Sequence, residues 1–441
     1  MNKWNTQGLV EADKKYVWHP FTSMAEWCAT DHEPIVLVEG QGALLRDSRG
    51  REYIDGNSSI WTNIHGHNHP HINAAIRQQL DRVAHTSFLG FTNPPAIELA
   101  KAIVELFPTG TFSRVFYSDD GSTGMEVAMR IASQYWQLHG SSRHRFISFR
   151  DAYHGDTAGA ASLGAAQMFQ TGFPQWRFPG RQINNLEELH ALPDSEAKLT
   201  AAVVIEPLIQ GAAGMKIWLP GILRAVREWC DRTGVLLIVD EVMTGFGRTG
   251  KMFASEHETV GADIMILAKA LTGGYLPLAI TLITDKIFRF FSKFDAPAGT
   301  LFYGHSYTGN ALACAAAKAS LEVFEREKTL EILQTRIAHL KAELSVLSGA
   351  PLIKEVRQCG FIAAVELDDR SFGKAGRVGA EVCIAARRYG LLTRAIRDVV
   401  VLMPPFSISL EQLTQAVQAI RQAIRDVYAE NSQRISAGAS R

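Results

Sequence analysis

One stretch of the chain reads Asp263-Ile264-Met265-Ile266-Leu267-Ala268-Lys269 and continues Ala270-Leu271-Thr272-Gly273-Gly274. An apolar run of this length that a glycine pair terminates predicts a buried strand, which places Lys269 where the strand gives way to a loop. A buried lysine is tolerated where its amine loses the proton easily, and such an amine is the usual nucleophile toward an aldehyde. The alternative is that Lys269 leaves the sheet and extends its charged end into water.

A second apolar run, Val235 to Val239, ends on the carboxylates Asp240 and Glu241. Asp240 precedes Lys269 by 29 residues, enough for one crossover between parallel strands. Ligands bind beyond the carboxyl ends of such strands, so we expect both side chains at one site. Pyridoxal 5′-phosphate uses both residue types, a lysine for its aldehyde and an aspartate for its protonated ring nitrogen. A metal-binding Asp-Glu pair is the competing interpretation, but no histidine or second carboxylate cluster accompanies it.

The segment Asp120-Gly121-Ser122-Thr123 follows an apolar run and begins an amphipathic helical pattern. Glycine and hydroxyl residues at a helix N-terminus offer free N–H groups and the positive end of the helix dipole, which favours a phosphate. An ordinary helix cap is the alternative. Farther along, Tyr153-His154-Gly155 offers an aromatic face that can stack on a flat ring, or a tyrosine that is simply part of the core.

Two other motifs are less informative than their letters suggest. Gly245 to Gly250 matches G-x-G-x-x-G, but Asp240-Glu241 stands between the strand and the glycines and no helix is predicted at Gly250, so a dinucleotide site is not expected. The tract from His65 to His71 has four histidines. It leads directly into a helix that begins with a proline and brings no cysteine or carboxylate, so we do not expect a metal.

Alternation of helical stretches with short β-branched runs dominates residues 96–310 and predicts a mostly parallel sheet that is covered on both faces. The predicted strands are 115–117, 146–149, 202–205, 235–239, 264–267 and 278–282. Residues beyond 310 predict a smaller α+β unit with helices near 310–325, 330–347, 374–389 and 410–429 and strands near 353–356 and 362–366. Residues 1–60 predict an irregular start and a hairpin of strands 34–38 and 43–47 around a turn at 39–42. The final dozen residues predict a frayed tail.

Composition favours small-molecule chemistry. The 441 residues include 45 basic and 45 acidic side chains, which cancel, so no global field favours nucleic acid or an anionic membrane. The five cysteines are scattered without a Cys-x-x-Cys pair, as in a reducing compartment. The sequence shows no signal peptide and no apolar run as long as the roughly 18 residues of a membrane span. We therefore expect a cytoplasmic protein that binds neither membranes nor nucleic acid.

Several motifs together resemble the class III, fold-type I aminotransferases that use pyridoxal 5′-phosphate. They are Asp120 to Thr123, Tyr153 to Thr157, Asp240 to Gly250 and Lys269 to Gly274. The resemblance covers nearly the whole chain. It implies a large domain with a mostly parallel seven-stranded sheet and a smaller α+β domain from both chain ends. The corresponding boundaries are 1–65 and 316–430 for the small domain, 66–315 for the large domain and 431–441 for a flexible tail.

The resemblance also implies a role for each matching residue. Lys269 forms the covalent link to the cofactor, Asp240 binds the ring nitrogen, and Tyr153 and Val242 cover the two ring faces. Gly121 and Ser122 bind the phosphate. Ser306 matches a residue that reaches the phosphate from the neighbouring subunit, which implies a homodimer with active sites at the subunit interface.

Further positions match the family's substrate pocket. Phe21, Ile60, Trp61 and Tyr153 are expected to line it, and Arg394 matches the arginine that binds the substrate carboxylate, for which a planar guanidinium is well suited.

Phe21 and Ile60 depart from the Tyr and Trp that many relatives using S-adenosylmethionine as amino donor have. This pair resembles a branch of the family that uses lysine, so the sequence leaves the donor open between the two.

The sequence also bears on other functions. Glutamate-coupled enzymes of the family carry a switching glutamate five residues after the glutamate of their Glu-Pro pair, whereas five residues after Glu206 this chain has Gly211. That departure opposes an ornithine or γ-aminobutyrate aminotransferase. A broad ω-amine:pyruvate aminotransferase stays open as a second enzyme function. A catalytically silent cofactor-binding protein is the alternative from another class, and the intact Asp240 and Lys269 pair argues against it.

Overall fold

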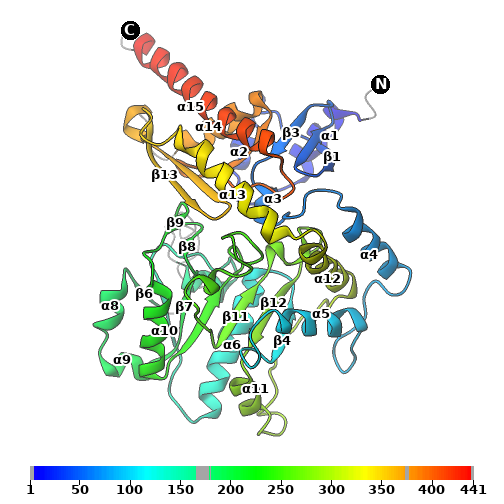
Figure 1. Cartoon of the computed structure of the whole chain (residues 1–441), viewed down its shortest axis with the longest axis vertical. Coiled ribbons are helices and arrows are strands. Elements are labelled where there is room, and N and C mark those ends of the chain that lie inside the picture. Colours follow the sequence, from blue (N-terminus) through cyan, green and yellow to red (C-terminus); the bar gives the residue numbers. More distant parts are fainter. Residues whose placement is uncertain (1–3, 165–177, 179, 373–376, 439–441) are drawn as a thin grey trace.

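Seven strands form the central sheet of the larger of two units. This computed structural model describes residues 4–164, 178, 180–372 and 377–438 (Figure 1). The strand order is β4-β12-β11-β10-β7-β5-β6. Their bounds are Arg114–Ser118, Ala279–Ile283, Ile264–Leu267, Leu236–Asp240, Thr200–Ile205, Arg145–Phe149 and Arg181–Ile183. Neighbours from β11 to β6 are parallel, and β12 alone runs antiparallel to β11 and β4. The expected mostly parallel, seven-stranded sheet is confirmed.

Helices cover both faces of this sheet, which explains why its middle strands are apolar without interruption. Alternate residues of β10 separate between two clusters: Leu236 and Ile238 pack with helix α6 (Gly121–Leu138), and Leu237 and Val239 pack with helix α10 (Ile222–Thr233). Because successive side chains of a strand point to opposite faces, a run of β-branched residues supplies both layers at once. The carboxyl ends of the strands are left to form the site.

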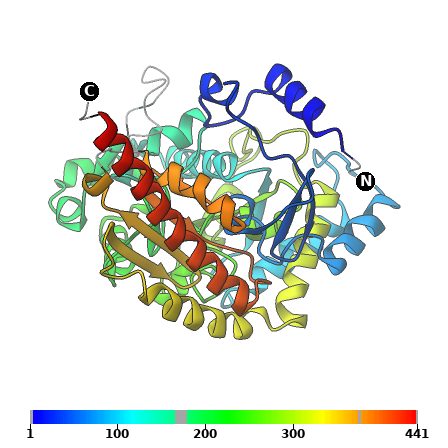
Figure 2. The same ribbon diagram turned by 90° about the horizontal axis from the view of Figure 1, so that it is seen from above.

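The smaller unit combines both ends of the chain. One sheet joins β1 (Leu37–Gln41), β2 (Leu44–Asp47) and β3 (Glu52–Asp55) to β15 (Leu391–Leu392), which pairs parallel to β3. A second sheet has the order β13-β14-β17-β16, with bounds Ile353–Cys359, Ile362–Leu367, Val399–Leu402 and Arg394–Ile396. Figure 2 shows helix α15 (Leu410–Gly438) lying across this unit. A small domain built from both chain ends is thus confirmed.

The remaining elements connect these layers. The helices are α1 Thr6–Tyr16, α2 Met24–Trp27, α3 Ser58–Trp61, α4 Pro70–Leu80, α5 Pro94–Glu105, α7 Ala158–Leu163, α8 Leu186–His190, α9 Asp194–Leu199, α11 Asp285–Phe291, α12 Ala311–Arg326, α13 Thr329–Ser345 and α14 Val378–Ala386. Short 3₁₀ turns span Ala254–His257, Lys269–Thr272, Asp369–Phe372 and Arg387–Tyr389. A two-stranded ribbon pairs β8 (Ile209–Gln210) with β9 (Lys216–Ile217).

Some sequence expectations at the chain ends were wrong. The irregular start contains helix α1, whose N-cap Asn5 accepts the Gly8 N–H at 3.1 Å. The hairpin turn lies at Gly42 and Ala43, where Gly42 takes a φ of 56°. Strand β1 therefore continues to Gln41, through the first three of the four residues expected to turn. Helix α15 extends to Gly438, past the start of the expected tail at 431. The predicted helix over 374–389 begins at Val378, and residues 373–376 lie outside the described part.

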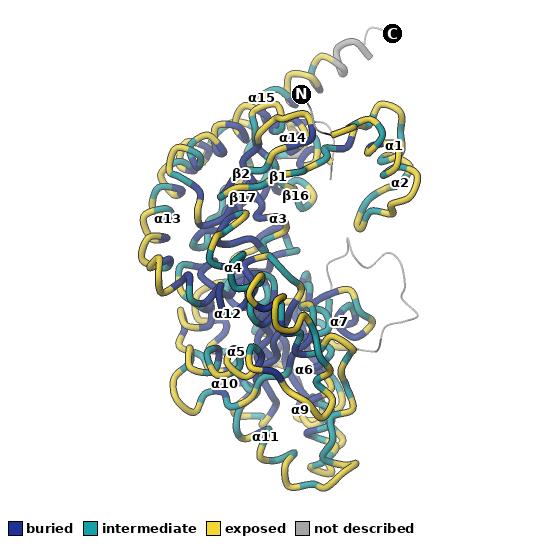
Figure 3. The backbone as a smooth tube through the Cα atoms, turned by 90° about the vertical axis from the view of Figure 1, so that its right-hand side faces the viewer, coloured by how far each residue is buried: buried dark blue, intermediate teal, exposed yellow. Residues whose placement is uncertain are grey.

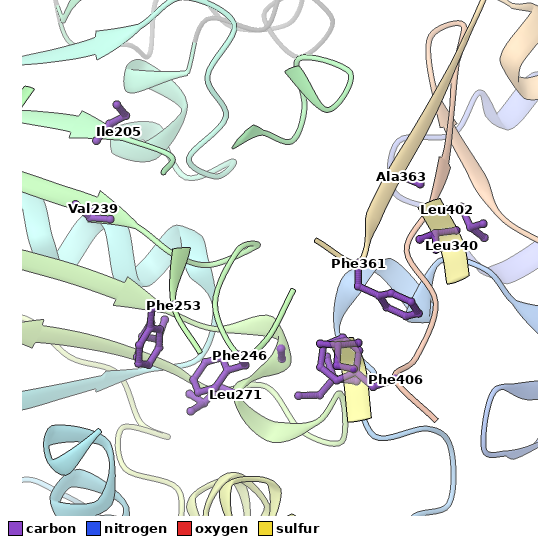
Figure 4. Packing of buried hydrophobic residues seen from close by; sticks show 14 of the residues in the cluster. Ile205, Val239, Phe246, Phe253, Leu271, Leu340, Phe361, Ala363, Leu402 and Phe406 are labelled. Atoms are coloured by element: carbon purple, nitrogen blue, oxygen red, sulfur yellow. The ribbon is translucent and has the colours of Figure 1, made fainter. Parts of the chain in front are cut away.

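The two units share one hydrophobic core. Figure 3 shows buried backbone continuing from one unit into the other. In Figure 4, Phe246, Phe253 and Leu271 of the large unit lie toward Phe361 and Phe406 of the small unit, and all five belong to one cluster of buried residues. The cavity described below therefore has walls whose relative placement is fixed by packing.

Arg357 adds a polar connection between the units. Its guanidinium donates to the Gly214 carbonyl oxygen at 2.7 Å and to the carboxylates of Glu355 and Glu366.

No helix among the described residues is long and apolar enough to cross a membrane.

Candidate active site

A cavity of about 490 Å³ lies beyond the carboxyl ends of β7, β10 and β11, the edge at which parallel sheets bind ligands. Seven of the predicted site residues line it: Trp61, Gly121, Ser122, Tyr153, Asp240, Val242 and Lys269. They come from segments that lie far apart in the sequence. Six of them lie at or after the carboxyl ends of strands of the central sheet, and Trp61 follows β3 of the small unit.

Lys269 opens a 3₁₀ turn two residues after β11 ends, and its backbone takes a φ of 46°. Its amine lies inside the cavity, 4.7 Å from the centroid of the Trp61 ring. Burial lowers the pKa of Lys269, although the charges of Asp240 and Glu206 oppose that shift. The amine therefore releases its proton more easily than an ordinary lysine, as a nucleophile toward an aldehyde must.

Asp240 ends β10 and is held by two hydrogen bonds. Its Oδ2 is 2.7 Å from Nδ1 of His154, and its Oδ1 accepts the Val242 N–H at 3.0 Å. Burial alone would lower the pKa of His154, but the hydrogen bond and charge of Asp240 and the charge of Glu206 outweigh it, so the pKa is raised. Nε2 of His154 is buried without a partner among the described residues. These two bonds fix the position of the Asp240 side chain at the end of β10.

Glu206 is a further buried carboxyl group of the cavity, and sequence reasoning assigned it no role at the site. It directly follows β7. Its Oε1 accepts the Gly211 N–H at 3.0 Å and its Oε2 accepts the Tyr153 N–H at 3.3 Å. Burial, together with the charge of Asp240, raises the pKa of Glu206 to about 7 even though His154 opposes the shift. The signal was present, because an apolar run that ends on a carboxylate also identified Asp240.

The N-terminus of α6 forms a tight floor to the cavity. Asp120 caps the helix by accepting the Thr123 N–H at 2.8 Å, which leaves the earlier N–H groups of Gly121 and Ser122 without acceptors inside the helix. A Cβ on Gly121 would lie 2.8 Å from Cγ1 of Val242, and one on Gly155 would lie 2.4 Å from Oγ of Ser122. The backbone at both positions therefore approaches its neighbours so closely that a residue larger than glycine would not fit without a shift.

Tyr153 lies between this floor and Glu206. Its hydroxyl donates to Oδ2 of Asp156 at 2.6 Å, and the Asp156 N–H donates to Oγ of Ser122 at 3.1 Å. Burial and the carboxylate of Asp156 raise the pKa of Tyr153. A nucleophilic lysine, a buried aspartate, an aromatic ring and a helix N-terminus in one cavity match the aldehyde, ring nitrogen, ring face and phosphate of pyridoxal 5′-phosphate. The residues present fit that cofactor.

Trp61 reaches the cavity from an unusual backbone segment. Ser58, Ser59, Ile60 and Trp61 all have positive φ angles, and none of them is glycine. Such a left-handed turn costs roughly 1–2 kcal/mol per residue for L-amino acids. The indole N–H of Trp61 donates to Oδ1 of Asn57 at 2.9 Å, so the ring direction is fixed from within the same turn.

Four predicted site residues lie outside the cavity lining. Phe21 and Ile60 are 59% and 41% exposed. The Arg394 guanidinium lies 5.8 Å from the centroid of the Phe21 ring. This contact brings together residues from the N-terminal and C-terminal parts of the chain. Ser306 is exposed, and its carbonyl oxygen is 2.7 Å from Nε2 of His85. The single chain therefore does not bring Ser306 to its own cavity.

The two motifs set aside above have structural roles. Residues 242–249 form turns, and no helix begins at Gly250. Glu241 is fully buried and accepts the N–H groups of Ala254 and Ser255.

The histidines 65, 67, 69 and 71 bind four different partners, which are Ser320, Asp55, Glu327 and Glu322. Within the described ranges, no group of three metal-ligating side chains gathers.

Comparison with known proteins adds independent findings. The sequence model of the family described as aminotransferase class-III matches residues 27–424. The chain is 43% identical over 453 residues to the adenosylmethionine-8-amino-7-oxononanoate aminotransferase of Geobacter sulfurreducens, with 97% of this chain and 99% of that protein covered.

Solved structures are similar over the same length. The enzyme of the same name from Methanocaldococcus jannaschii superposes with a TM-score of 0.92 at 37% identity, covering 96% of this chain and 99% of that one. A PLP-bound amine transaminase from an uncultivated Pseudomonas species superposes with a TM-score of 0.87 at 30% identity, covering 93% and 99%.

Proposed function

Since this chain belongs to the class-III aminotransferases, we propose that it converts 8-amino-7-oxononanoate to 7,8-diaminononanoate, a step of biotin biosynthesis, with S-adenosylmethionine or lysine as amino donor. Pyridoxal 5′-phosphate is its cofactor. One observation carries the proposal most directly: a lysine amine with a lowered pKa and a buried aspartate line the same cavity.

The cofactor, when bound, supplies an electron-accepting ring and an aldehyde. Lys269 would hold the aldehyde, and its Nζ would accept a proton from the amine-bearing carbon of the donor and return it later. Asp240 would keep the ring nitrogen protonated, and the bond from His154 holds that carboxylate in place. Tyr153 and Val242 would enclose the ring, and the N–H groups of Gly121 and Ser122 would bind the phosphate.

Substrate recognition is assigned to the small domain. Arg394 lies beside Phe21 and carries a guanidinium that can bind a carboxylate with two parallel hydrogen bonds. Phe21, Ile60 and Trp61 give the acceptor's carbon chain an apolar surface. We further propose a cytoplasmic homodimer, in which Ser306 reaches the phosphate of the neighbouring subunit. The exposure of Ser306, Phe21 and Ile60 on one chain supports that arrangement.

The experiment that tests this proposal is a half-reaction. The cofactor-loaded enzyme is mixed separately with S-adenosylmethionine and with lysine, and the absorbance of the lysine-bound cofactor is followed. The donor that bleaches this absorbance is the amino donor, and 8-amino-7-oxononanoate should restore it. If neither donor bleaches the enzyme, or if the oxononanoate does not restore the absorbance, the proposal is wrong.

The substitution Lys269→Ala removes the amine that is proposed to bind the cofactor and transfer the proton. We expect loss of the borohydride-trappable link and a fall in turnover of about 10³-fold or more. Lys251→Ala is the matched control, because Lys251 is exposed in a nearby turn and donates to the Glu256 carbonyl oxygen outside the cavity lining. A Lys269→Ala protein that still turns over would contradict the assignment.

A second candidate is a broad ω-amine:pyruvate aminotransferase. The similarity to the PLP-bound amine transaminase favours it as the alternative. Offering pyruvate and the oxononanoate to the amine-loaded enzyme separates the two, because only the favoured acceptor will restore the starting absorbance at low concentration.

A further inference from the structure

The left-handed turn that carries Trp61 needs an anchor. Ser58, Ser59, Ile60 and Trp61 have φ angles of 45°, 49°, 77° and 67°. A run of this kind persists only where the surrounding structure holds it, and it concentrates at functional sites. The last residue of the run places its ring 4.7 Å from the amine of Lys269. A change in the turn would therefore move a wall of the cavity.

Asp55 holds this turn from its first half. It ends β3 and is 3% exposed. Its Oδ1 accepts the N–H groups of Asn57 at 3.2 Å and Ser59 at 3.1 Å. Its Oδ2 accepts the hydroxyl of Ser59 at 3.0 Å. The carboxylate thus fixes the backbone directly before and inside the strained run.

Asp55 also holds the chain that follows the turn. Oδ2 lies 2.9 Å from Nε2 of His67, and Nδ1 of His67 lies 2.8 Å from the side-chain amide nitrogen of Asn63. Since the amide donates to Nδ1, Nε2 carries the proton and donates to Asp55. A Cβ on Gly274 would lie 2.8 Å from the Asn63 backbone, so the loop after Lys269 packs against the same segment.

We propose that Asp55 is a positioning residue for amino transfer: it holds the left-handed turn Ser58–Trp61 and thereby fixes the Trp61 ring beside Lys269. Asp55 does not line the cavity and acts through the turn. The kinetic part of the test rests on the proposed function. The structural part needs neither cofactor nor substrate. A failure of the positioning role of Asp55 is therefore distinguishable from a failure of the proposed function.

Asp47 provides a matched control in the same sheet. It ends β2, is 2% exposed, and accepts four hydrogen bonds, from the N–H groups of Arg49 and Arg51, the Arg51 guanidinium and the Tyr53 hydroxyl. Its turn lies outside the cavity lining. Asp47→Asn therefore perturbs the same kind of buried carboxylate without touching the turn that carries Trp61.

The first measurement is hydrogen exchange of the cofactor-free chain, followed by mass spectrometry of peptides that cover residues 56–64. Asp55→Asn should speed exchange there by at least about tenfold, because an amide group adds a donor where Ser59 and His67 already donate. Asp47→Asn should leave these peptides unchanged. Equal exchange of this segment in both variants would overturn the proposal.

The second measurement is kinetic and includes a rescue. Asp55→Asn should raise KM for the oxo acid and lower kcat/KM at least about tenfold, whereas Asp47→Asn should change kcat/KM less than twofold. Adding Ser59→Gly to Asp55→Asn should recover at least half of the loss on a logarithmic scale, because glycine adopts a positive φ without strain. Should Asp55→Asn fail to fold, the double variant is expected to fold. A double variant that does not improve on Asp55→Asn would overturn the proposal.

Discussion

Replacing Glu206 by glutamine removes an ionisable group from the centre of the cavity while keeping its size. Burial raises the pKa of Glu206 to about 7, whereas the same group in the unfolded chain has its ordinary value of 4.5. The native protein therefore keeps a proton that the unfolded chain releases as pH rises from 4.5 to 7. The stability linked to this proton is fully present below pH 4.5 and is lost as pH rises through 7.

The size of the effect follows from the shift. A pKa unit corresponds to about 1.4 kcal/mol, so the whole shift is worth about 3 kcal/mol. For 441 residues, the entropy of unfolding converts about 1 kcal/mol into about 1 °C of melting temperature. The glutamine variant also loses about 1–3 kcal/mol of unfolding free energy at every pH. Its amide NH₂ faces one of the two backbone N–H groups that donate hydrogen bonds to Glu206.

The assay is thermal unfolding of the cofactor-free protein between pH 4.5 and 7.5, and the quantity of interest is wild-type Tm minus variant Tm. We expect this difference to fall by about 3 °C across the range, since other titrating groups cancel. Glu258→Gln is the matched control for a lost acceptor, because Glu258 is equally buried and accepts the N–H groups of Gly221 and Arg224 outside the cavity. A pH dependence identical to that of the control would refute the reasoning.

Two further predictions concern the cavity floor and the contact between units. Gly155→Ala should weaken cofactor binding at least about tenfold in an equilibrium titration, because its Cβ would lie 2.4 Å from Ser122 Oγ at a φ of 130°. Gly261→Ala, with open space around it, should leave the affinity unchanged. Arg357→Lys should lower the free energy of unfolding by about 2 kcal/mol, because lysine cannot make the bond to the Gly214 carbonyl and both carboxylate contacts at once. The exposed Arg46→Lys should change it by less than about 0.5 kcal/mol, and equal unfolding curves for both variants would contradict the idea of an interdomain bond.

The sequence was most informative where a local pattern and a topological rule agree. Asp240 and Lys269 both follow buried apolar runs, and the rule that parallel strands end at one edge was enough to place them together. The helix start at Gly121 was visible for the same reason, since a cap and an apolar period coincide there. These features depend on a few neighbouring residues, so the sequence contains them directly.

The missed features depend on contacts between distant segments. His154 acquires its role only when the segments after β5 and β10 meet beyond the sheet. Glu206 differs, because it follows an apolar run as Asp240 does and could have been predicted. The edge strand β6 and the two-residue β15 are too short to show a periodic pattern, and helix α1 buries only Val10. The left-handed turn at Ser58–Trp61 contradicts every local preference of its residues, so it could not be predicted from them.

The pairing of β3 with β15 also has a consequence for biosynthesis. Ile54 lies beside Leu391, so the first sheet of the small unit lacks one strand until roughly 340 further residues have been translated, which takes tens of seconds at typical rates. The nascent N-terminal segment must wait through the synthesis of the entire large unit with the open edge of β3 exposed. Co-translational folding of this chain should therefore begin with the large unit. The N-terminal segment, which has emerged from the ribosome without its partner strand, is the part most in need of a chaperone.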